Sequence, residues 1–381
     1  MKHRIPLAKP EILQQDRDAV LEVLSTSQLS MGTRLAEFEE AICACTGSKF
    51  AVAVNSGTSA LHLCLRMLAL PENSEVVLPS FAFAAPLNVL LQEKLRPVFA
   101  EIDPVTLNVT AETIAAALTP RTKAIIAVHT FGRPLDMHGI RKLAEERKVP
   151  VIEDACEALG ATVYNQMTGT FGEVGALAFY PNKQITTGEG GIFLTSNTQL
   201  AEKGRRLRNQ GRDPSLGVLQ HVEAGYSYRL SDINCALGIS QLRRLEDTLQ
   251  RRQAIARLYD EKLAGIPLIV RPPLTSPQGR ISWFAYVVQL APPLGADCRD
   301  WICTAMERHG IGTGKYFAPL HLQPVLKNTN RPLLPITEEV AQRVIALPFF
   351  NQITDAEVEE VCVALSSSLA QFTAGFSRRK Q

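Results

Sequence analysis

Short apolar runs recur along the first half of the chain, and their spacing is the feature that most limits the fold. They lie between residues 50 and 195, and most are separated by segments long enough for a helix. The runs are FAVAV, EVVLP, RPVFAEID, KAIIAVH, VPVIED, VGALAFY and GGIFLT. Buried strands that alternate with helices predict an α/β protein with a mainly parallel sheet covered by helices. Ligands of such sheets bind beyond the carboxyl ends of the strands, so polar residues after each run are candidates for a site.

The rest of the chain predicts a second, smaller domain. A helical stretch over residues 231–264 carries spaced leucines and then many charges, as expected of a connector that leaves the large domain. Several prolines follow, and then WFAYVVQL, whose β-branched and aromatic residues predict a strand. We therefore expect a large domain over residues 1–250 and a small C-terminal α/β domain over residues 251–381.

Composition excludes some classes of partner. Forty basic and 38 acidic residues give a formal charge of +2, which is too balanced to attract nucleic acid or an anionic membrane surface. The eight cysteines contain no C-x-x-C pair and predict free thiols in a reducing compartment. The first residues, MKHRIPLAKPE, lack the apolar region of a signal peptide. We expect a cytoplasmic protein and, because the histidines lack ligand-like spacing, no metal site.

The first candidate site is the turn NSGTS, which follows the run FAVAV and opens a helical pattern. Gly57 lets the backbone approach a ligand closely, and the amides at the start of a helix favour an anion. Thr58 adds a hydroxyl donor. The pattern predicts a phosphate cradle, although an ordinary helix cap explains it equally well.

Two further candidates follow later strands. Asp154 ends the run VPVIED, where alternation places it on the face opposite Glu153. Its carboxylate could pair with a protonated ring nitrogen of a cofactor or, more simply, cap a helix. Lys183 follows an apolar strand and precedes a Gly-rich turn, so its amine is either a nucleophile and general base or a plain surface lysine.

Taken together, several motifs of the chain resemble the DegT/DnrJ/EryC1/StrS family of sugar aminotransferases. The motifs are NSGTSAL, EDACEALGA, FYPNKQITTGEGG and GYSYRLSDINCALGISQL, with IPLAKPEI near the start and KYFAPLHLQP and LPFF near the end. The resemblance runs essentially from end to end. It implies the fold type I of enzymes dependent on pyridoxal 5'-phosphate (PLP), the aspartate aminotransferase-like fold.

The resemblance also implies roles for particular residues. Lys183 matches the lysine that forms a Schiff base with PLP, and Asp154 matches the carboxylate paired with the pyridine nitrogen. Glu157 falls where the family has Gln, His or Glu near the phenolic oxygen of the cofactor. Phe83 matches the aromatic residue that stacks on the ring, with ordinary core packing as the alternative.

At the phosphate end the chain both matches the family and departs from it. Gly57 and Thr58 match the phosphate-binding turn. Ala178 stands five residues before the lysine, where the family often has serine, and Ser227 replaces the asparagine of a GYNYR motif that reaches the phosphate of the neighbouring subunit. We therefore expect phosphate affinity to depend more on backbone amides and on the Ser227 hydroxyl.

Two histidines remain as weaker candidates. His129 ends the run KAIIAVH, where the family places a residue close to the cofactor, and a hydrogen-bonded structural role is equally compatible with the sequence. His321 lies in PLHLQP, where the family places contacts with the substrate, and we expect a substrate or interface role.

The resemblance implies transfer of an amino group, with glutamate as donor, to a keto group of a nucleotide-linked 6-deoxy sugar. The perosamine-synthetase-like branch favours the C4 ketone, and the family's sites at a subunit interface imply a homodimer. A cyclitol ketone would suit the same residues. Related sugar dehydratases carry histidine in place of Lys183, and a non-catalytic PLP-binding regulator would not need Lys183 with Asp154.

Overall fold

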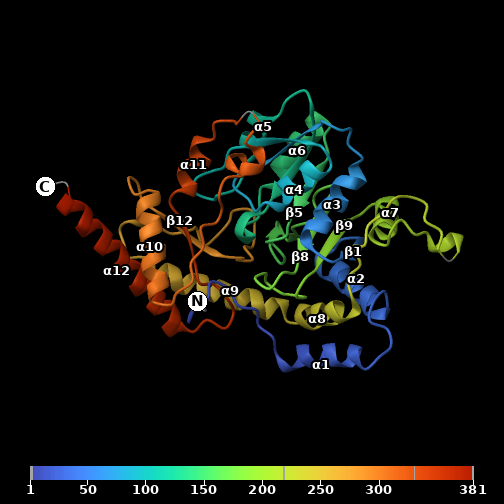
Figure 1. Cartoon of the computed structure of the whole chain (residues 1–381), viewed down its shortest axis with the longest axis horizontal. Coiled ribbons are helices and arrows are strands. Elements are labelled where there is room, and N and C mark those ends of the chain that lie inside the picture. The colour runs from blue at the N-terminus through green and yellow to red at the C-terminus, as the bar shows by residue number, and fades with distance from the viewer. Residues whose placement is uncertain (1–2, 218, 330, 380–381) are drawn as a thin grey trace.

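A central sheet dominates the computed structural model, which describes residues 3–217, 219–329 and 331–379 (Figure 1). Its seven strands lie in the order β1-β9-β8-β5-β4-β2-β3. They are β1 (Phe50–Val54), β2 (Glu75–Pro79), β3 (Arg96–Ala100), β4 (Thr122–Val128), β5 (Val151–Asp154), β8 (Val174–Ala178) and β9 (Gly191–Thr195). Neighbours from β8 to β3 run parallel, whereas β9 is antiparallel to both β1 and β8. The prediction of an α/β fold with a mainly parallel sheet is confirmed.

Helices cover both faces of this sheet. Up to residue 242 they are α1 (Gln14–Leu24), α2 (Thr33–Thr46), α3 (Gly57–Leu68), α4 (Ala85–Gln92), α5 (Ala111–Ala117), α6 (Met137–Arg147), α7 (Thr198–Arg208) and α8 (Asp232–Leu242). Alternation along β1 shows how the layers form: Val52 packs in one apolar cluster with Leu61 of α3, and Ala51 packs in another with Phe38 of α2. Apart from the edge strand β3, which is buried only at its end, the short apolar runs of the sequence are strands buried on both faces.

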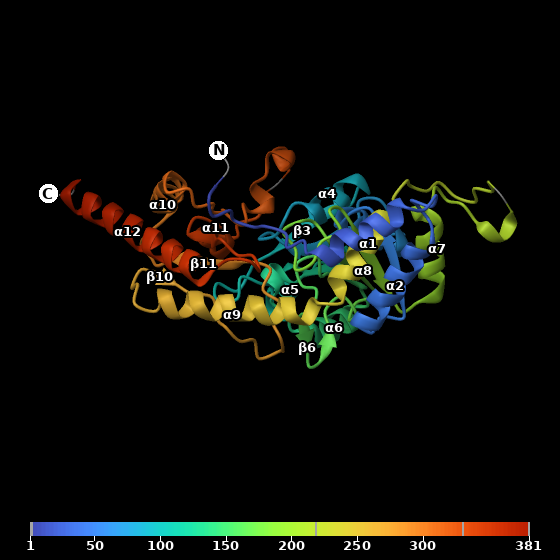
Figure 2. The ribbon, with the colours of Figure 1, turned by 90° about the horizontal axis from the view of Figure 1, so that it is seen from below.

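The C-terminal part of the chain, after residue 244, forms a second group of helices and strands. It contains α9 (Leu245–Leu263), β10 (Ile269–Val270), β11 (Tyr286–Leu290), α10 (Ala296–Arg308), α11 (Pro335–Ala341), β12 (Val344–Leu347) and α12 (Asp355–Arg379). The three strands form an antiparallel sheet in the order β10-β11-β12, while β6 (Thr162–Val163) and β7 (Gln166–Met167) form a small hairpin. Figure 2 shows α9 running from the central sheet towards α10 and α12.

The helical stretch expected over residues 231–264 is divided in two. Arg244 leaves the helical region (φ −115°, ψ 21°), and its guanidinium instead donates to the Asp16 carboxylate at 2.7 Å and to the Glu11 carbonyl. The first turns of α9 then pack Leu249 with the central sheet's apolar cluster, and later turns pack Tyr259 with the C-terminal cluster. The predicted division at residue 250 falls inside this shared helix and stays a prediction.

An arm projects from the body between α7 and α8 (Figures 1 and 2). Antiparallel bridges pair Asn209 with Ser227 and Arg212 with His221, so the two sides of the arm run next to each other.

Within the described ranges, no helix combines the length and the apolar character needed to cross a membrane.

Candidate active site

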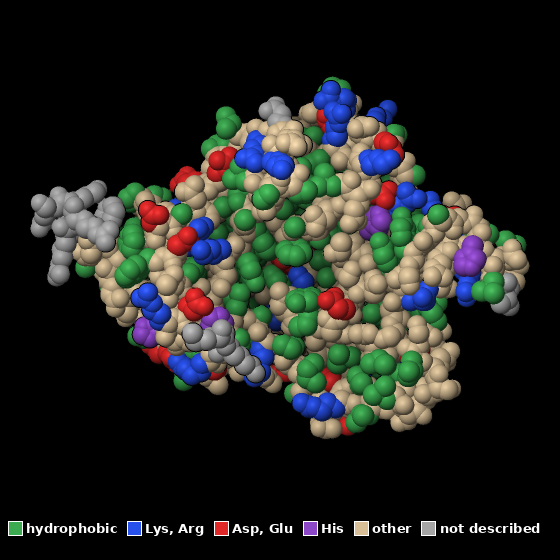
Figure 3. Space-filling model, viewed as in Figure 1, with side chains coloured by type: hydrophobic (Ala, Val, Ile, Leu, Met, Phe, Trp, Pro, Cys, Tyr) green, Lys and Arg blue, Asp and Glu red, His purple; other side chains and the backbone are tan. Residues whose placement is uncertain are grey.

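A pocket of about 260 Å³ opens at the carboxyl ends of β4, β5 and β8. Figure 3 shows a hollow near the middle of the molecule, with a mostly apolar rim and charged atoms at its base. Six residues predicted from the sequence line the pocket: Gly57, Thr58, Phe83, Asp154, Glu157 and Lys183. Two others, Ser227 and His321, do not line it.

The turn between β1 and α3 forms one wall. The Ser56 hydroxyl accepts the amide of Ser59 at 3.0 Å and so caps α3. Gly57 and Thr58 are the first two residues of the helix, where backbone amides have no acceptor within the helix and the dipole is positive. A Cβ atom on Gly57 would lie 2.5 Å from Cβ of Ala178, so only glycine fits this approach. The wall therefore offers an anion two amides and a hydroxyl.

Asp154 lies at the end of β5 and is 6% exposed. Its Oδ1 atom accepts the amide of Cys156 at 3.0 Å, and residues 155–161 form turns, so Asp154 caps no helix. Burial raises the pKa of the Asp154 carboxyl, and the positive charge of Lys183 partly opposes this. A cationic group in the pocket would therefore be strongly favoured beside this carboxylate.

Lys183 and Glu157 face each other in the pocket. The Nζ atom of Lys183 lies 3.7 Å from Oε1 of Glu157 and 4.1 Å from the centre of the Phe284 ring. The other Glu157 oxygen accepts the amide of Phe131 at 2.9 Å. Burial raises the pKa of Glu157, and the nearby charge of Lys183 opposes it. The lysine amine is thus held between a carboxylate and an aromatic ring.

Aromatic side chains form the rim of the pocket. Phe83 is 62% exposed, which rules out the alternative of ordinary core packing, and its ring centre lies 6.5 Å from that of Phe317. Tyr180 and Tyr316 also line the pocket. Sequence reasoning missed Phe284, Tyr316 and Phe317, because these residues follow α9 and lie far along the chain from the carboxyl ends of the central strands. The rim can pack against a flat ring or an apolar sugar face.

Two buried polar atoms in the pocket wall have no hydrogen-bond partner within the described residues. They are Oγ1 of Thr130 and Oδ1 of Asn182. Buried polar atoms of native proteins are normally paired, so these two are suited to a bound ligand. Both were missed, although one follows a strand end and the other precedes Lys183.

His129 lies outside the pocket and is wholly buried. Its Nε2 atom lies 2.7 Å from Oε1 of Glu153, and its Nδ1 atom accepts the amide of Leu135 at 3.1 Å. Glu153, on the sheet face opposite Asp154, also accepts the amides of Gly169 and Phe171. Of the two readings that the sequence left open, the contacts favour a structural histidine.

His321 is 1% exposed and is bonded on both sides of its ring. Nδ1 lies 2.6 Å from the hydroxyl of Ser80, directly after β2, and Nε2 lies 3.1 Å from Glu338. The Leu320 amide also donates to the Ser80 carbonyl at 2.8 Å. This geometry leaves no ring nitrogen for a substrate and instead fastens the segment after Phe317 to the sheet.

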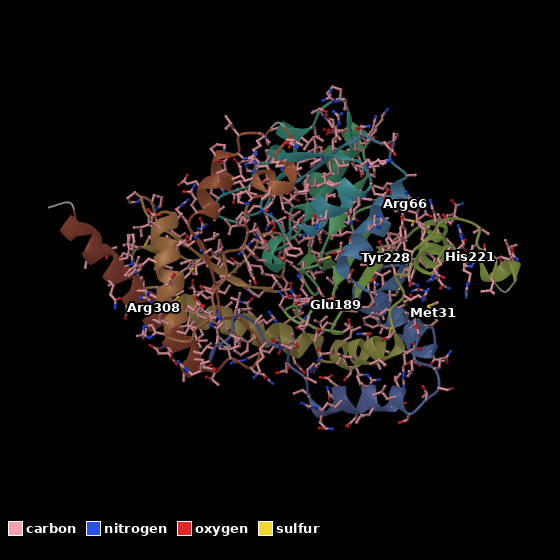
Figure 4. All side chains as sticks on the ribbon, in the orientation of Figure 1. Met31, Arg66, Glu189, His221, Tyr228 and Arg308 are labelled. Atoms are coloured by element: carbon pink, nitrogen blue, oxygen red, sulfur yellow. The ribbon has the colours of Figure 1, made fainter. Side chains whose placement is uncertain are left out.

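Ser227 lies at the base of the arm. Its hydroxyl accepts Nη2 of Arg229 at 2.9 Å, and its carbonyl accepts the Asn55 side chain at 3.4 Å. Figure 4 shows Glu189 of the pocket rim near the middle of the molecule and Tyr228, next to Ser227, farther towards α7. Ser227 does not line the pocket of its own chain.

No group of three or more His, Cys, Asp and Glu side chains arranged for a metal ion occurs within residues 3–217, 219–329 and 331–379.

Comparisons with known proteins identify the family. The family model for DegT/DnrJ/EryC1/StrS aminotransferases matches residues 10–366. The chain is 36% identical to GDP-perosamine synthase of Caulobacter vibrioides, over 96% of this chain and 98% of that protein. It is 32% identical to the aminotransferase TlmJ of Streptoalloteichus hindustanus, with a TM-score of 0.91 over 97% of this chain and all of the other. The fold is also that of Spr1654 of Streptococcus pneumoniae in its PLP form (24% identity, TM-score 0.91, 96% and 99% of the two chains).

PLP is the cofactor, and the described residues fit it. The cradle offers amides for a phosphate, the buried Asp154 offers an anion for a ring nitrogen, and Lys183 offers an amine in the same pocket. The unpartnered Thr130 and Asn182 oxygens offer further polar contacts. With a family model matched over most of its length, this chain belongs to the DegT/DnrJ/EryC1/StrS aminotransferase family.

Proposed function

We propose that this protein transfers the amino group of glutamate to the C4 keto group of a nucleotide-linked 6-deoxy sugar. The observation that carries the proposal is the meeting of Lys183, Asp154 and the Gly57 cradle in one pocket. The substrate class is supported by the identity of 36% to an enzyme whose name gives a nucleotide-linked sugar, GDP-perosamine, as its product.

Three side chains would perform the chemistry. When bound, PLP supplies an electron-withdrawing ring that eases proton removal from the carbon next to the transferred nitrogen. Lys183 Nζ would take the α-proton of glutamate and later deliver a proton to the sugar carbon. Asp154 would keep the proton on the ring nitrogen, and Glu157, 3.7 Å from Nζ, would hold the amine in place.

The remaining predicted residues would bind the cofactor phosphate, stack on its ring or support the rim of the pocket. The amides of Gly57 and Thr58 would bind its phosphate, because they lie at the positive end of α3. Phe83, exposed at the rim, would stack on the ring. His321 would act indirectly, by holding the segment that carries Phe317.

We further propose a homodimer in which the arm packs against a second copy. The arm carries exposed apolar side chains, Leu216 and Leu219, which are 62% and 60% exposed in the single chain. Ser227 at its base does not line its own pocket, and the family resemblance assigns this position to the cofactor phosphate of the neighbouring subunit. The cysteines of the described chain are free, which supports a cytoplasmic location.

Two other functions use the same pocket. A cyclitol ketone could replace the keto-sugar, because the roles proposed for Lys183 and Asp154 concern the ketone carbon and the cofactor ring, and not the ring that bears the ketone. A non-catalytic PLP-binding regulator would bind cofactor without turnover. The pairing of Lys183 with Glu157 favours an enzyme, because mere binding needs no mobile proton carrier.

The test combines covalent trapping with absorbance. Protein incubated with PLP is reduced with borohydride and mapped by mass spectrometry, and the visible absorbance of bound cofactor is followed after glutamate is added. Lys183→Ala is compared with Lys142→Ala, an exposed lysine on α6. Trapping at Lys183 and a glutamate-dependent change, both lost only in Lys183→Ala, are expected.

Candidate acceptors are then supplied to the glutamate-treated protein. Recovery of the original absorbance with nucleotide-linked 4-keto-6-deoxy sugars, and not with cyclitol ketones, is the expected result. Recovery only with the cyclitol would replace the substrate class, and trapping without any response to amino donors would favour the regulator.

A further inference from the structure

Arg252 is a buried cation to which the proposed reaction assigns no role. It lies on α9, is 3% exposed, and forms no ion pair within the described residues. Burial lowers the pKa of its guanidinium to about 10, and the Nε atom has no hydrogen-bond acceptor. Burying a charge without a carboxylate partner is costly, so the contacts that this guanidinium does make call for an explanation.

The guanidinium lies over the Phe349 ring, 5.5 Å from its centre, and its hydrogen bonds reach two residues that line the pocket, Lys183 and Phe284. Nη2 donates to the backbone carbonyl of Lys183 at 3.3 Å, and Nη1 donates to the carbonyls of Trp283 at 2.9 Å and Phe284 at 3.3 Å. The Phe284 ring is the one over which Lys183 Nζ lies, 4.1 Å from its centre. One planar cation therefore fixes both the backbone of the lysine and the ring against which its amine packs.

The segment held by Arg252 is strained. Trp283 has a φ of 51°, in the left-handed region that bulky residues rarely adopt, and Phe131 has a φ of 59°. The two strained segments are joined, because the Phe284 amide donates to the Phe131 carbonyl at 3.0 Å. The Phe131 amide in turn donates to Glu157. Contacts thus run without a gap from Arg252 to both partners of the Lys183 amine.

We propose that Arg252 is a positioning residue, which holds Lys183 Nζ in register with Glu157 and the pocket. It does not line the pocket, so its effect would pass through the carbonyls of Lys183 and Phe284. The inference rests on the proposed role of Lys183. Because reaction rates depend steeply on placement of the reacting group, a displaced amine would slow chemistry more than it would weaken binding.

Arg133 provides a matched control. It is 7% exposed, burial lowers its pKa to about 10, and it too donates to backbone carbonyls, those of Thr275 at 2.9 Å and of Pro273. Neither Arg133 nor its two acceptors lines the pocket. Arg133→Met therefore reproduces the loss of a buried guanidinium without touching Lys183.

The experiment compares Arg252→Met, Arg252→Lys and Arg133→Met with the wild type in the full chain. In cofactor-free protein, the rate at which an amine-reactive ester labels Lys183 is measured by mass spectrometry. In protein with PLP, the rate of covalent trapping at Lys183, the affinity for PLP and the single-turnover rate with glutamate are measured. Thermal midpoints are recorded for all four proteins.

For Arg252→Met we expect the single-turnover rate to fall about tenfold to a hundredfold, with less than about a threefold change in PLP affinity. Labelling of Lys183 should change in Arg252→Met and stay near the wild-type rate in Arg133→Met. Arg252→Lys keeps the charge but has one donor nitrogen, so an intermediate rate is expected, and this variant carries the test should Arg252→Met not fold.

Equal effects of Arg252→Met and Arg133→Met on labelling and turnover would overturn the inference, as would loss of thermal stability with unchanged Lys183 chemistry. The proposed function fails in a different way, when wild-type protein traps no PLP at Lys183. Labelling of the cofactor-free chain would still decide the role of Arg252 in that case.

Discussion

The Oε1 atom of Glu157 lies 3.7 Å from Nζ of Lys183, and the two side chains are 9% and 13% exposed. Each charge compensates the burial of the other. Removal of the lysine leaves a buried carboxyl whose pKa is already raised by burial and is no longer opposed by a cation.

Lys183→Ala is therefore expected to become less stable, relative to the wild type, as pH rises. A carboxyl with a raised folded-state pKa stabilises the fold most below its ordinary pKa, and this contribution is lost as pH rises through the raised value. The deficit should reach about 3 kcal/mol in cofactor-free protein. Urea unfolding at several pH values measures it, and adding Glu157→Gln should remove it; a deficit that does not change with pH would contradict this coupling.

Asp154→Asn should stabilise the cofactor-free protein while reducing activity. Burial raises the pKa of Asp154 from its ordinary value of 3.8, so its stabilising contribution is present below that pH and is lost as pH rises through the folded-state value. The amide does not titrate and still accepts the Cys156 amide. The gain in thermal midpoint should grow with pH, and turnover should fall about a hundredfold or more. A variant less stable than wild type at pH 8 would refute the prediction.

Gly57→Ala should weaken PLP binding and cost about 1–3 kcal/mol of stability. The added Cβ would lie 2.5 Å from Cβ of Ala178 and 3.2 Å from Sγ of Cys156. Ala178→Gly removes the nearer atom, so the double variant should recover part of both losses. Gly265→Ala, which would meet no atom within 4 Å, is the control and should behave as wild type.

Ser80→Ala should change the turnover rate and the KM for the sugar to about the same extent as His321→Ala. The two side chains are hydrogen-bonded at 2.6 Å and neither lines the pocket, so both variants release the segment that carries Phe317. The double variant should be little worse than either single one, because the residues act as a unit. If His321→Ala alone raises the KM for the sugar, His321 contacts the substrate as the sequence predicted.

His129→Ala should destabilise the fold by about 3–5 kcal/mol, because it empties the space of a wholly buried ring and leaves the buried Glu153 carboxylate with backbone amides alone as partners. Arg141→Ala, which breaks an exposed pair with Glu145 one turn away on α6, should cost less than about 0.5 kcal/mol. Denaturant midpoints in cofactor-free protein compare the two. An equally small loss in both variants would assign His129 no structural role.

Local sequence was sufficient for the elements of the central sheet. Each apolar run became a strand within a few residues of its expected bounds, because a strand buried on both faces needs a run of apolar side chains whatever its neighbours are. Strand ends also marked Gly57, Asp154 and Lys183, since the carboxyl ends of parallel strands meet at one edge. The identity of the cofactor, PLP, was predicted from the resemblance of the motifs to a known family.

Only the tertiary structure decided which distant side chains meet. Ser80 and His321, for which the sequence predicted a substrate or interface role, lie 241 residues apart in the chain, and their side chains are hydrogen-bonded in the protein interior. Phe284 and Phe317 reach the pocket from C-terminal segments, and Arg252 reaches the Lys183 carbonyl from α9. Such contacts depend on how the layers pack, which periodicity along one segment does not encode.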